Sequence, residues 1–236
     1  MSGLGEKRMV VAIDGPAGAG KSTVAQRLAQ ALGYVLLDTG AIYRAVALAA
    51  VRAGVAWDDE TGVAALTESL TAREGLRLES APEIGGKGVR VWLDGDDVTS
   101  ELRTAEISLG ASLVSSVPRV RAALLELQRA LGASGGVVAE GRDIGTVVFP
   151  NANVKFFLTA SVAIRSERRY DELMTSGHAA DIDQVRGEVE LRDRRDSERA
   201  VAPLRQAEDA ILIDSGGRDV PDIVAELKDA VLRAAG

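Results

Sequence analysis

The sequence contains no cysteine and a single histidine in 236 residues. Without cysteine, the chain has no disulfide framework, no thiolate metal site and no cysteine nucleophile. The one histidine, His178, lies in the polar run Thr175–Asp183, where we expect a solvated loop residue. A histidine metal cluster and a serine triad are therefore excluded as well, which removes several enzyme classes before any motif is considered.

Long apolar runs and excess positive charge are also absent. Stretches such as Ala45–Val51 fall well short of the roughly 20 apolar residues of a membrane helix, and Met1–Arg8 lacks the apolar segment of a signal peptide. We therefore expect a cytoplasmic protein with no membrane partner. The formal net charge of −7 argues against a surface that binds polymeric nucleic acid through its phosphates. The 46% of hydrophobic residues can still bury a full core.

Strand and helix patterns alternate along most of the chain. Short apolar runs predict buried strands, and longer segments with helical spacing predict helices. Strands are expected at Val10–Ile13, Val35–Leu37, Val137–Ala139, Val154–Leu158 and Ala210–Ile213, and helices at Ser22–Leu32, Ala41–Arg52, Val120–Leu131 and Val220–Ala234. This alternation predicts an α/β fold in which helices cover both faces of a parallel sheet.

The region from Gly75 to Val98 breaks this rhythm. Its residues alternate in the manner of strands, and turn signals occur at Gly85-Gly86 and Asp94-Gly95. We interpret it as a small antiparallel β insert between the second and third core strands, a lobe rather than a separate domain.

A phosphate-binding loop follows the first predicted strand. Residues 15–22 match the pattern GxxxxGK[ST] between a strand and a helix, the context that the mechanism requires. The glycines let backbone N–H groups face an anion at the positive end of the helix, and Lys21 can reach the β- and γ-phosphates. Ser22 is the candidate ligand for Mg²⁺. The expected ATP-binding residues are Gly15, Pro16, Ala17, Gly18, Ala19, Gly20, Lys21, Ser22 and Thr23.

A phosphate-binding loop alone does not distinguish a GTPase, a motor ATPase and a small-molecule kinase. The sequence has no NKxD guanine signature and no long apolar strand that ends in a plain Walker-B aspartate. The carboxylate nearest to that position is Glu140, which could order the water shell of a magnesium ion. These features favour a small kinase.

Arginines gather in two segments of this acidic chain, at residues 165–169 and 192–199. A nucleoside monophosphate acceptor is already anionic near neutral pH, because its second phosphate pKa is about 6. Its phosphorylation therefore needs no general base, but it needs fixed positive charge against phosphate repulsion. On the residues alone, a solvated charged face remains an alternative for the second segment.

Two further segments lie where strands are expected to end, which is where open α/β sheets bind ligands. They are Asp38-Thr39-Gly40, followed by Tyr43 and Arg44, and Glu140-Gly141-Arg142-Asp143. A helix cap with a surface arginine is the alternative for the first segment, and a charged loop is the alternative for the second.

The motifs together resemble bacterial cytidylate kinases along essentially the whole chain after the N-terminal tail. The resemblance is carried by IDGPAGAGKST at Ile13–Thr23, LLDTGAIYR at Leu36–Arg44, PRVR at Pro118–Arg121, EGRDIGTVVFP at Glu140–Pro150 and RDRRDSERAVAPL at Arg192–Leu204. It implies a P-loop NTPase fold with the antiparallel insert in the nucleotide-binding lobe and a helical lid. The implied activity is ATP-dependent phosphorylation of CMP and dCMP.

The resemblance also implies roles for residues of the acceptor site. The family often has serine in place of Thr39, which keeps the hydroxyl and adds a methyl group. Asp143 would accept a hydrogen bond from the exocyclic amine of cytosine, which uracil lacks. The implied groups are Arg44, Arg142, Arg199 and Thr39 at the acceptor phosphate, Arg192 and Asp196 at the ribose, and Ser112, Arg121 and Asp143 at the cytosine edge.

The segment Ala160–Asp183 resembles the mobile lid of the family. Its Arg165 and Arg169 would stabilise the transferring phosphoryl group, which makes the expected catalytic residues Lys21, Arg142, Arg165, Arg169 and Arg199. We expect one cytidylate kinase domain over residues 1–236, with a core of 9–38, 116–159 and 200–236, a nucleotide-binding lobe at 39–115 and a lid region at 160–199. A monomer is expected, since the sequence shows no obvious exposed apolar periodicity.

Two other readings stay open on the sequence. One is another P-loop small-molecule kinase, such as adenylate or shikimate kinase. The other is a regulatory module in which ATP only switches conformation, but two arginine clusters exceed what one triphosphate needs.

Overall fold

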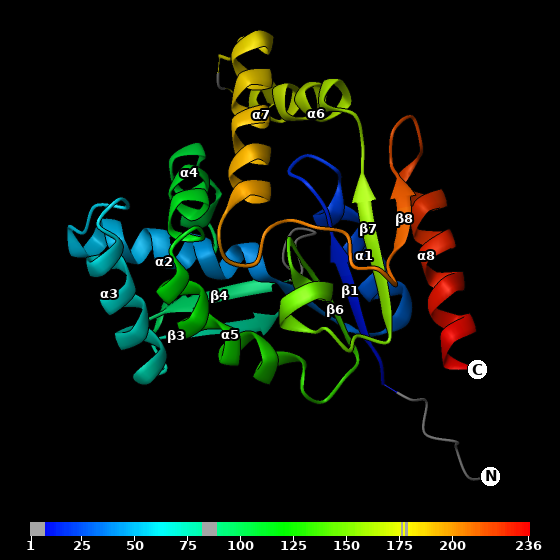
Figure 1. Cartoon of the computed structure of the whole chain (residues 1–236), viewed down its shortest axis with the longest axis horizontal. Coiled ribbons are helices and arrows are strands. Elements are labelled where there is room, and N and C mark those ends of the chain that lie inside the picture. Colours follow the sequence, from blue (N-terminus) through cyan, green and yellow to red (C-terminus); the bar gives the residue numbers. More distant parts are fainter. Residues whose placement is uncertain (1–7, 82–88, 176, 178) are drawn as a thin grey trace.

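In a computed structural model of the chain, residues 8–81, 89–175, 177 and 179–236 are described. The predicted turn at Gly85-Gly86 and His178 lie outside these residues. Figure 1 shows a central sheet, an antiparallel sheet with helices beside it, and a helix pair beyond the strand ends.

Five parallel strands form the main sheet in the order β2-β6-β1-β7-β8. Their bounds are β1 at Val10–Asp14, β2 at Val35–Asp38, β6 at Val137–Gly141, β7 at Val154–Thr159 and β8 at Ile211–Asp214. All five residues of β6 are buried, as are the last four of β1, because both strands are covered on both faces. The predicted α/β fold is confirmed, and each expected strand is present with its bounds shifted by at most one or two residues.

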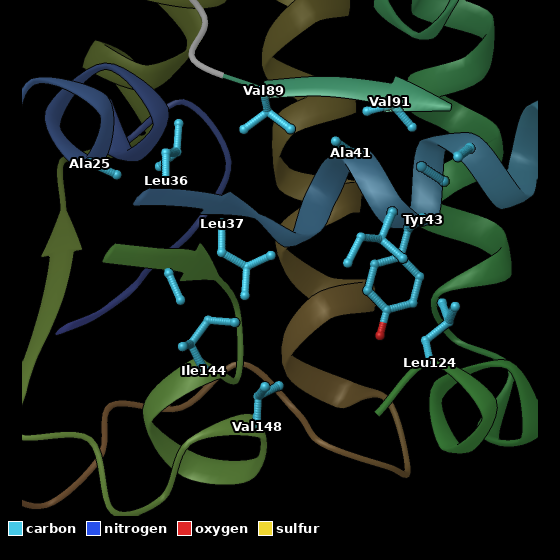
Figure 2. Packing of buried hydrophobic residues seen from close by; sticks show 14 of the residues in the cluster. Ala25, Leu36, Leu37, Ala41, Tyr43, Val89, Val91, Leu124, Ile144 and Val148 are labelled. Carbon is cyan, nitrogen blue, oxygen red and sulfur yellow. The ribbon is translucent and has the colours of Figure 1, made fainter. Parts of the chain in front are cut away.

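Helical elements cover both faces of this sheet. Helix α1 (Lys21–Leu32) packs against α8 (Val220–Ala235), and the π-helical turn η2 (Ile144–Val148) packs against β1, β6 and α5 (Pro118–Gly132). In β2, Leu36 points to the side where Ala25 of α1 lies, and Leu37 points to the opposite side toward Ile144 (Figure 2). This alternation is the two-residue period of a strand, and it joins the two halves of the core.

The predicted antiparallel insert lies in the chain between β2 and β6. It contains the antiparallel sheet β3-β4-β5, with the predicted Asp94-Gly95 turn between β4 and β5. Helix α3 was not predicted from the sequence; its buried face is formed by Val63, Ala64, Thr67 and Leu70, and the Thr67 hydroxyl donates to the Val63 carbonyl. The elements are α2 (Thr39–Ala53), α3 (Glu60–Ala72), β3 (Leu76–Ser80), β4 (Val89–Leu93), β5 (Asp96–Asp97), η1 (Glu101–Arg103) and α4 (Ala105–Val114).

Helices α6 (Val162–Thr175) and α7 (Ile182–Glu198) pack against each other. They lie beyond the carboxyl ends of the parallel strands, on the side to which the β7 arrow points in Figure 1. Both therefore face the edge of the sheet where a ligand site is expected. In the described part of the chain, no helix is long and apolar enough to cross a membrane.

The contact between helix α4 and Trp57 requires a glycine, because a side chain would overlap the indole ring. Gly110 of α4 lies against the indole of Trp57, whose ring nitrogen donates to the Ala47 carbonyl of α2 at 3.0 Å. The three atoms nearest to an added Cβ at Gly110 would all be indole carbons, at separations that no real Cβ shows. The Trp57 ring therefore sets the spacing between the loop before α3 and helix α4.

We expect Gly110→Ala to destabilise the protein by about 1–3 kcal/mol, because the added methyl group must displace the hydrogen-bonded indole. At this chain length, that corresponds to a fall in Tm of about 2–4 °C per kcal/mol, measured by thermal unfolding. Gly187→Ala on α7 is the matched control, since nothing lies within 4 Å of its added Cβ. There, the better helix propensity of alanine should raise or preserve stability. Equal Tm values for Gly110→Ala and wild type would contradict the packing argument.

Candidate active site

Three carboxylates meet at the carboxyl edge of the sheet because of strand register. Ile13 of β1 and Asp38 of β2 both pair with Glu140 of β6, and Asp14 pairs with Gly141 one residue further on. Asp14 and Glu140 are each 4% exposed. Burial raises the pKa of Asp14 to about 6, although the backbone N–H groups of Gly145 and Ile144 oppose that rise. Carboxylates therefore line this largely buried edge of the sheet, where they can hold cationic groups.

The phosphate-binding loop begins directly after Asp14. Gly15, Gly18 and Gly20 have φ values of 149°, 75° and 87°, which side chains rarely adopt. A Cβ on Gly15 would also overlap the Leu158 carbonyl of β7. Gly20 is the N-cap of α1 and provides no side-chain cap, so the N-terminal N–H groups of the helix remain directed at the loop. This is the geometry that binds phosphate.

Lys21 lies at the start of α1 with 5% of its surface exposed. Its Nζ donates to the Pro16 carbonyl at 2.8 Å, across the base of the loop. Burial lowers the pKa of Lys21 to about 7, and the positive charge of Arg142 adds to this effect while Glu140 opposes it. An anion above the loop would reverse the shift, because it stabilises the ammonium form.

Ser22 and Glu140 provide oxygen donors beside the loop. Burial raises the pKa of Glu140, Asp38 adds to the rise, and Lys21 and a hydrogen bond with the Ser22 side chain oppose it. The described residues contain no group of three or more His, Cys, Asp or Glu side chains placed to hold a metal by themselves. Mg²⁺ does not require one, since it typically takes one or two protein oxygens, substrate phosphates and water. A hydroxyl and a carboxylate at this point fit that ion.

The arginines expected at the acceptor phosphate are held by carboxylates. Arg44 donates to Asp38 at 2.8 Å, and Arg142 donates through Nε to Asp196 at 2.7 Å. Asp38 also accepts from the Ala41 backbone and so begins α2. These pairs hold two guanidinium groups at the carboxyl edge in the absence of a ligand. A ligand that binds there would not have to order them.

Thr39 and Asp143 lie at the same edge. The Thr39 hydroxyl donates to the Glu140 carbonyl at 2.8 Å, and its side chain is buried. Asp143 accepts from Arg121 through one oxygen and from Arg199 through the other, the second at 3.2 Å. The guanidinium of Arg121 also lies over the Tyr43 ring, 5.4 Å from its centroid. One carboxylate thus joins α5, the turn after β6 and the end of α7.

Two polar atoms in this region are buried without a hydrogen-bond partner among the described residues. They are Oγ of Ser112 in α4 and Nε of Arg192 in α7. Burial lowers the pKa of Arg192 to about 10, with Arg142 adding to the effect and Asp196 opposing it. Orphaned buried donors are costly, so both atoms are suited to a polar ligand. Arg192 and Asp196 share a face of α7, whereas Arg199 follows the helix as its C-cap.

The arginines of α6 differ in what they touch. Arg165 donates to the Ala17 carbonyl of the phosphate-binding loop at 3.0 Å and is held by Asp193 of α7 at 2.6 Å. Arg168 reaches Gly18 on the same loop at 3.3 Å. Arg169 instead pairs with Glu172 on its own helix at 3.1 Å, although its charge also lowers the pKa of Arg192. Arg165 and Arg168 therefore connect α6 to the loop.

Three acidic residues of the site had no specific role in the sequence analysis: Asp14, Asp38 and Asp193. Asp14 and Asp38 each follow an apolar strand, and that position at a strand end was the available signal. Asp193 offered none, since it belongs to a charged run that reads equally well as a solvated face. Each is recognised only through its partner on another element.

Comparison with known proteins identifies the family of the chain. A family model described as Cytidylate kinase matches residues 11–233. The chain is 51% identical to the cytidylate kinase of Syntrophotalea carbinolica over 225 residues, which covers 95% of this chain and 92% of that protein. It is 49% identical to the cytidylate kinase of Geobacter sp. strain M21 over 231 residues, covering 98% and 96% respectively. A crystal structure of an uncharacterized protein from Eubacterium ventriosum has a TM-score of 0.52 at 14% identity, covers 95% of this chain and 99% of that chain, and shares the fold alone. The chain belongs to the cytidylate kinase family.

Proposed function

We propose that this protein transfers the γ-phosphoryl group of ATP to CMP and dCMP, forming ADP and CDP or dCDP. The observation that carries the proposal is the set of carboxylate-held arginines beside the phosphate-binding loop, where Arg142 is close enough to Lys21 to lower its pKa. A donor phosphate on the loop and an acceptor phosphate on the arginines would then meet at one edge of the sheet. Membership of the cytidylate kinase family supports the same reaction.

The chemistry requires charge stabilisation more than proton transfer. The acceptor oxygen is anionic near neutral pH, so no side chain has to act as a base. Lys21 would hold the β- and γ-phosphates, and Arg142, Arg199 and Arg44 would offset the charge of the acceptor phosphate. When bound with ATP, Mg²⁺ would neutralise phosphate charge, with Ser22 and Glu140 as the protein groups that hold it. Arg165 would add positive charge from the lid side of the loop.

Base and ribose recognition follow from the remaining groups. Asp143 would face the exocyclic amine of cytosine, with Ser112 and Arg121 beside it, and the unpartnered Ser112 hydroxyl supports a polar ligand there. Arg192 and Asp196 would bind the ribose, which the buried, unpartnered Nε of Arg192 supports. For the division of the chain, we propose residues 39–115 as the nucleotide-binding lobe and 160–199 as the lid on the core.

An acceptor panel tests the reaction. We expect coupled ADP release with CMP and dCMP to exceed that with UMP, AMP or shikimate by at least about tenfold in kcat/KM, because UMP and shikimate offer no exocyclic amine to Asp143 and AMP carries its amine on a larger purine ring. Activity with AMP or shikimate above that with CMP would assign the chain another acceptor. Slow ATP hydrolysis that no acceptor accelerates would instead support a nucleotide-switched module.

Proton uptake on ATP binding tests the role of Lys21. Because its pKa is about 7 in the free protein, Lys21 is mostly neutral at pH 8, and phosphate should restore the ammonium form. We expect uptake approaching about one proton per ATP at pH 8 and near zero at pH 6. The measurement is isothermal titration calorimetry in buffers of different ionisation enthalpy. Lys21→Met should abolish the uptake and lower kcat by roughly 10³-fold, whereas Lys228→Met on α8 should change neither. Equal uptake by Lys21→Met and wild type would assign the proton elsewhere.

Base discrimination tests Asp143. Asp143→Ala should lower kcat/KM for CMP by about 5- to 150-fold, since a buried hydrogen-bond partner is worth about 1–3 kcal/mol. UMP offers no amine and should lose less, and the ATP dissociation constant should change little. The measurement is kcat/KM for both acceptors at saturating ATP. An equal loss for CMP and UMP would mean that Asp143 only orients Arg121 and Arg199.

A further inference from the structure

The turn that carries Asp143 begins in an unusual way. Asp143 is the N-cap of η2, and aspartate is among the residues that best cap a helix N-terminus with their own side chain. Its carboxylate makes no capping hydrogen bond, and its carbonyl alone accepts from Val147 and Val148. Both side-chain oxygens are instead directed at Arg121 and Arg199.

The free N–H groups at this N-terminus are bound by a different strand. Asp14 of β1 accepts from the Ile144 N–H at 2.8 Å through one oxygen and from the Gly145 N–H at 2.7 Å through the other. The residue is 4% exposed, so these hydrogen bonds are not in competition with water.

We propose that Asp14 caps η2 in place of Asp143 and thereby releases the Asp143 carboxylate for the acceptor site. Asp14 is then a positioning residue, and this role rests on the proposed function. Without it, the Ile144 and Gly145 N–H groups would be left unsatisfied in the interior, at a cost comparable to a lost cap. Asp143 is the nearest carboxylate in sequence that could turn back to satisfy them. That rotation would break its hydrogen bonds to Arg121 and Arg199.

Asp14 lies between the phosphate-binding loop and the turn that carries Asp143, so it contacts both proposed nucleotide sites. Asp14 directly precedes Gly15, which opens the phosphate-binding loop, and its side chain holds the turn that follows Arg142 and Asp143. A change at Asp14 should therefore affect acceptor recognition more than its distance from the cytosine would suggest. Donor binding should be less affected, because the loop is held independently by its glycine geometry and by Lys21.

A double-mutant cycle between Asp14 and Asp143 tests the inference. Asp14→Ala should lower kcat/KM for CMP by about 5- to 30-fold, from a cap worth about 1–2 kcal/mol, and reduce the preference for CMP over UMP. It should change the ATP dissociation constant by less than about twofold. In the Asp14→Ala background, the fold-loss in kcat/KM for CMP caused by Asp143→Ala should be less than about a fifth of the fold-loss it causes in wild type, because Asp143 has already left the site. Asp14→Asn keeps one acceptor oxygen, so its kcat/KM for CMP should lie between those of Asp14→Ala and wild type. It replaces Asp14→Ala in the cycle if that variant does not fold.

Asp59→Ala is the matched control. Asp59 caps α3 by accepting from the Gly62 N–H at 2.9 Å, and among the described residues no hydrogen bond or ion pair joins it to the residues proposed for the acceptor site. This variant should lose stability and keep the kinetics of wild type. The inference would be overturned if the fold-losses in kcat/KM of the two single variants multiplied in the double variant, and if Asp14→Ala lowered Tm and reduced kcat/KM for CMP and UMP by the same factor.

The crystal structure of the Asp14 variant gives a readout that does not depend on activity. The inference predicts that the Asp143 carboxylate there accepts from the Ile144 or Gly145 N–H. An Asp143 that still lies between Arg121 and Arg199 would overturn the inference even in an active enzyme. A wild-type protein without pyrimidine kinase activity would overturn the proposed function, while the structural arm would still decide how η2 is capped.

Discussion

Charges buried at the carboxyl edge of the sheet have to be compensated within the protein, because an unpaired ion in the interior costs several kcal/mol. Asp14, Lys21, Glu140, Asp143 and Asp196 are all under 10% exposed there. Asp143 and Asp196 pair with arginines of other elements, and Asp14 accepts from two backbone N–H groups. Lys21 and Glu140 each favour the charged form of the other. The phosphate-binding loop, the turn after β6 and α7 are thereby fixed relative to one another. The folded core and the site depend on the same ion pairs.

The carboxylate partners also determine how the arginines at this edge are oriented. The arginines at the edge are bound by carboxylates from below or beside, through Asp38, Asp143 and Asp196. Their orientation is set before any nucleotide arrives, so little reorganisation is required when phosphate charge develops, and this is the condition under which electrostatic stabilisation is most effective. A protein with a net charge of −7 can in this way hold a cluster of arginines at one edge of its sheet.

Predictability differed between elements for identifiable reasons. The strands β1 and β6 begin with continuous apolar runs, and β7 is apolar except for Lys155 and its last residue, because these strands are largely covered on both faces, and such runs are visible without a structure. Helix α3 was missed because its buried face gives a weak apolar pattern. That face includes a polar residue, Thr67, a small one, Ala64, and a β-branched one, Val63. In the site, Lys21 and the glycines of the loop follow from local spacing. Asp193 could not be distinguished from solvated charges, because its role consists of holding Arg165 28 residues away.

By itself, the sequence determined the alternation of strands and helices in the core, the phosphate-binding loop and the motifs of the family, because each depends on residues that are close along the chain. Only the tertiary structure decided how the charges are paired. Asp14 meets Ile144 and Gly145 across 130 and 131 residues, and Asp143 meets Arg121 and Arg199 from both sides. These pairs follow from the parallel register of β1 and β6 and from where α7 ends. Short-range patterns carry no information about such distances, since register is set by packing of the whole sheet.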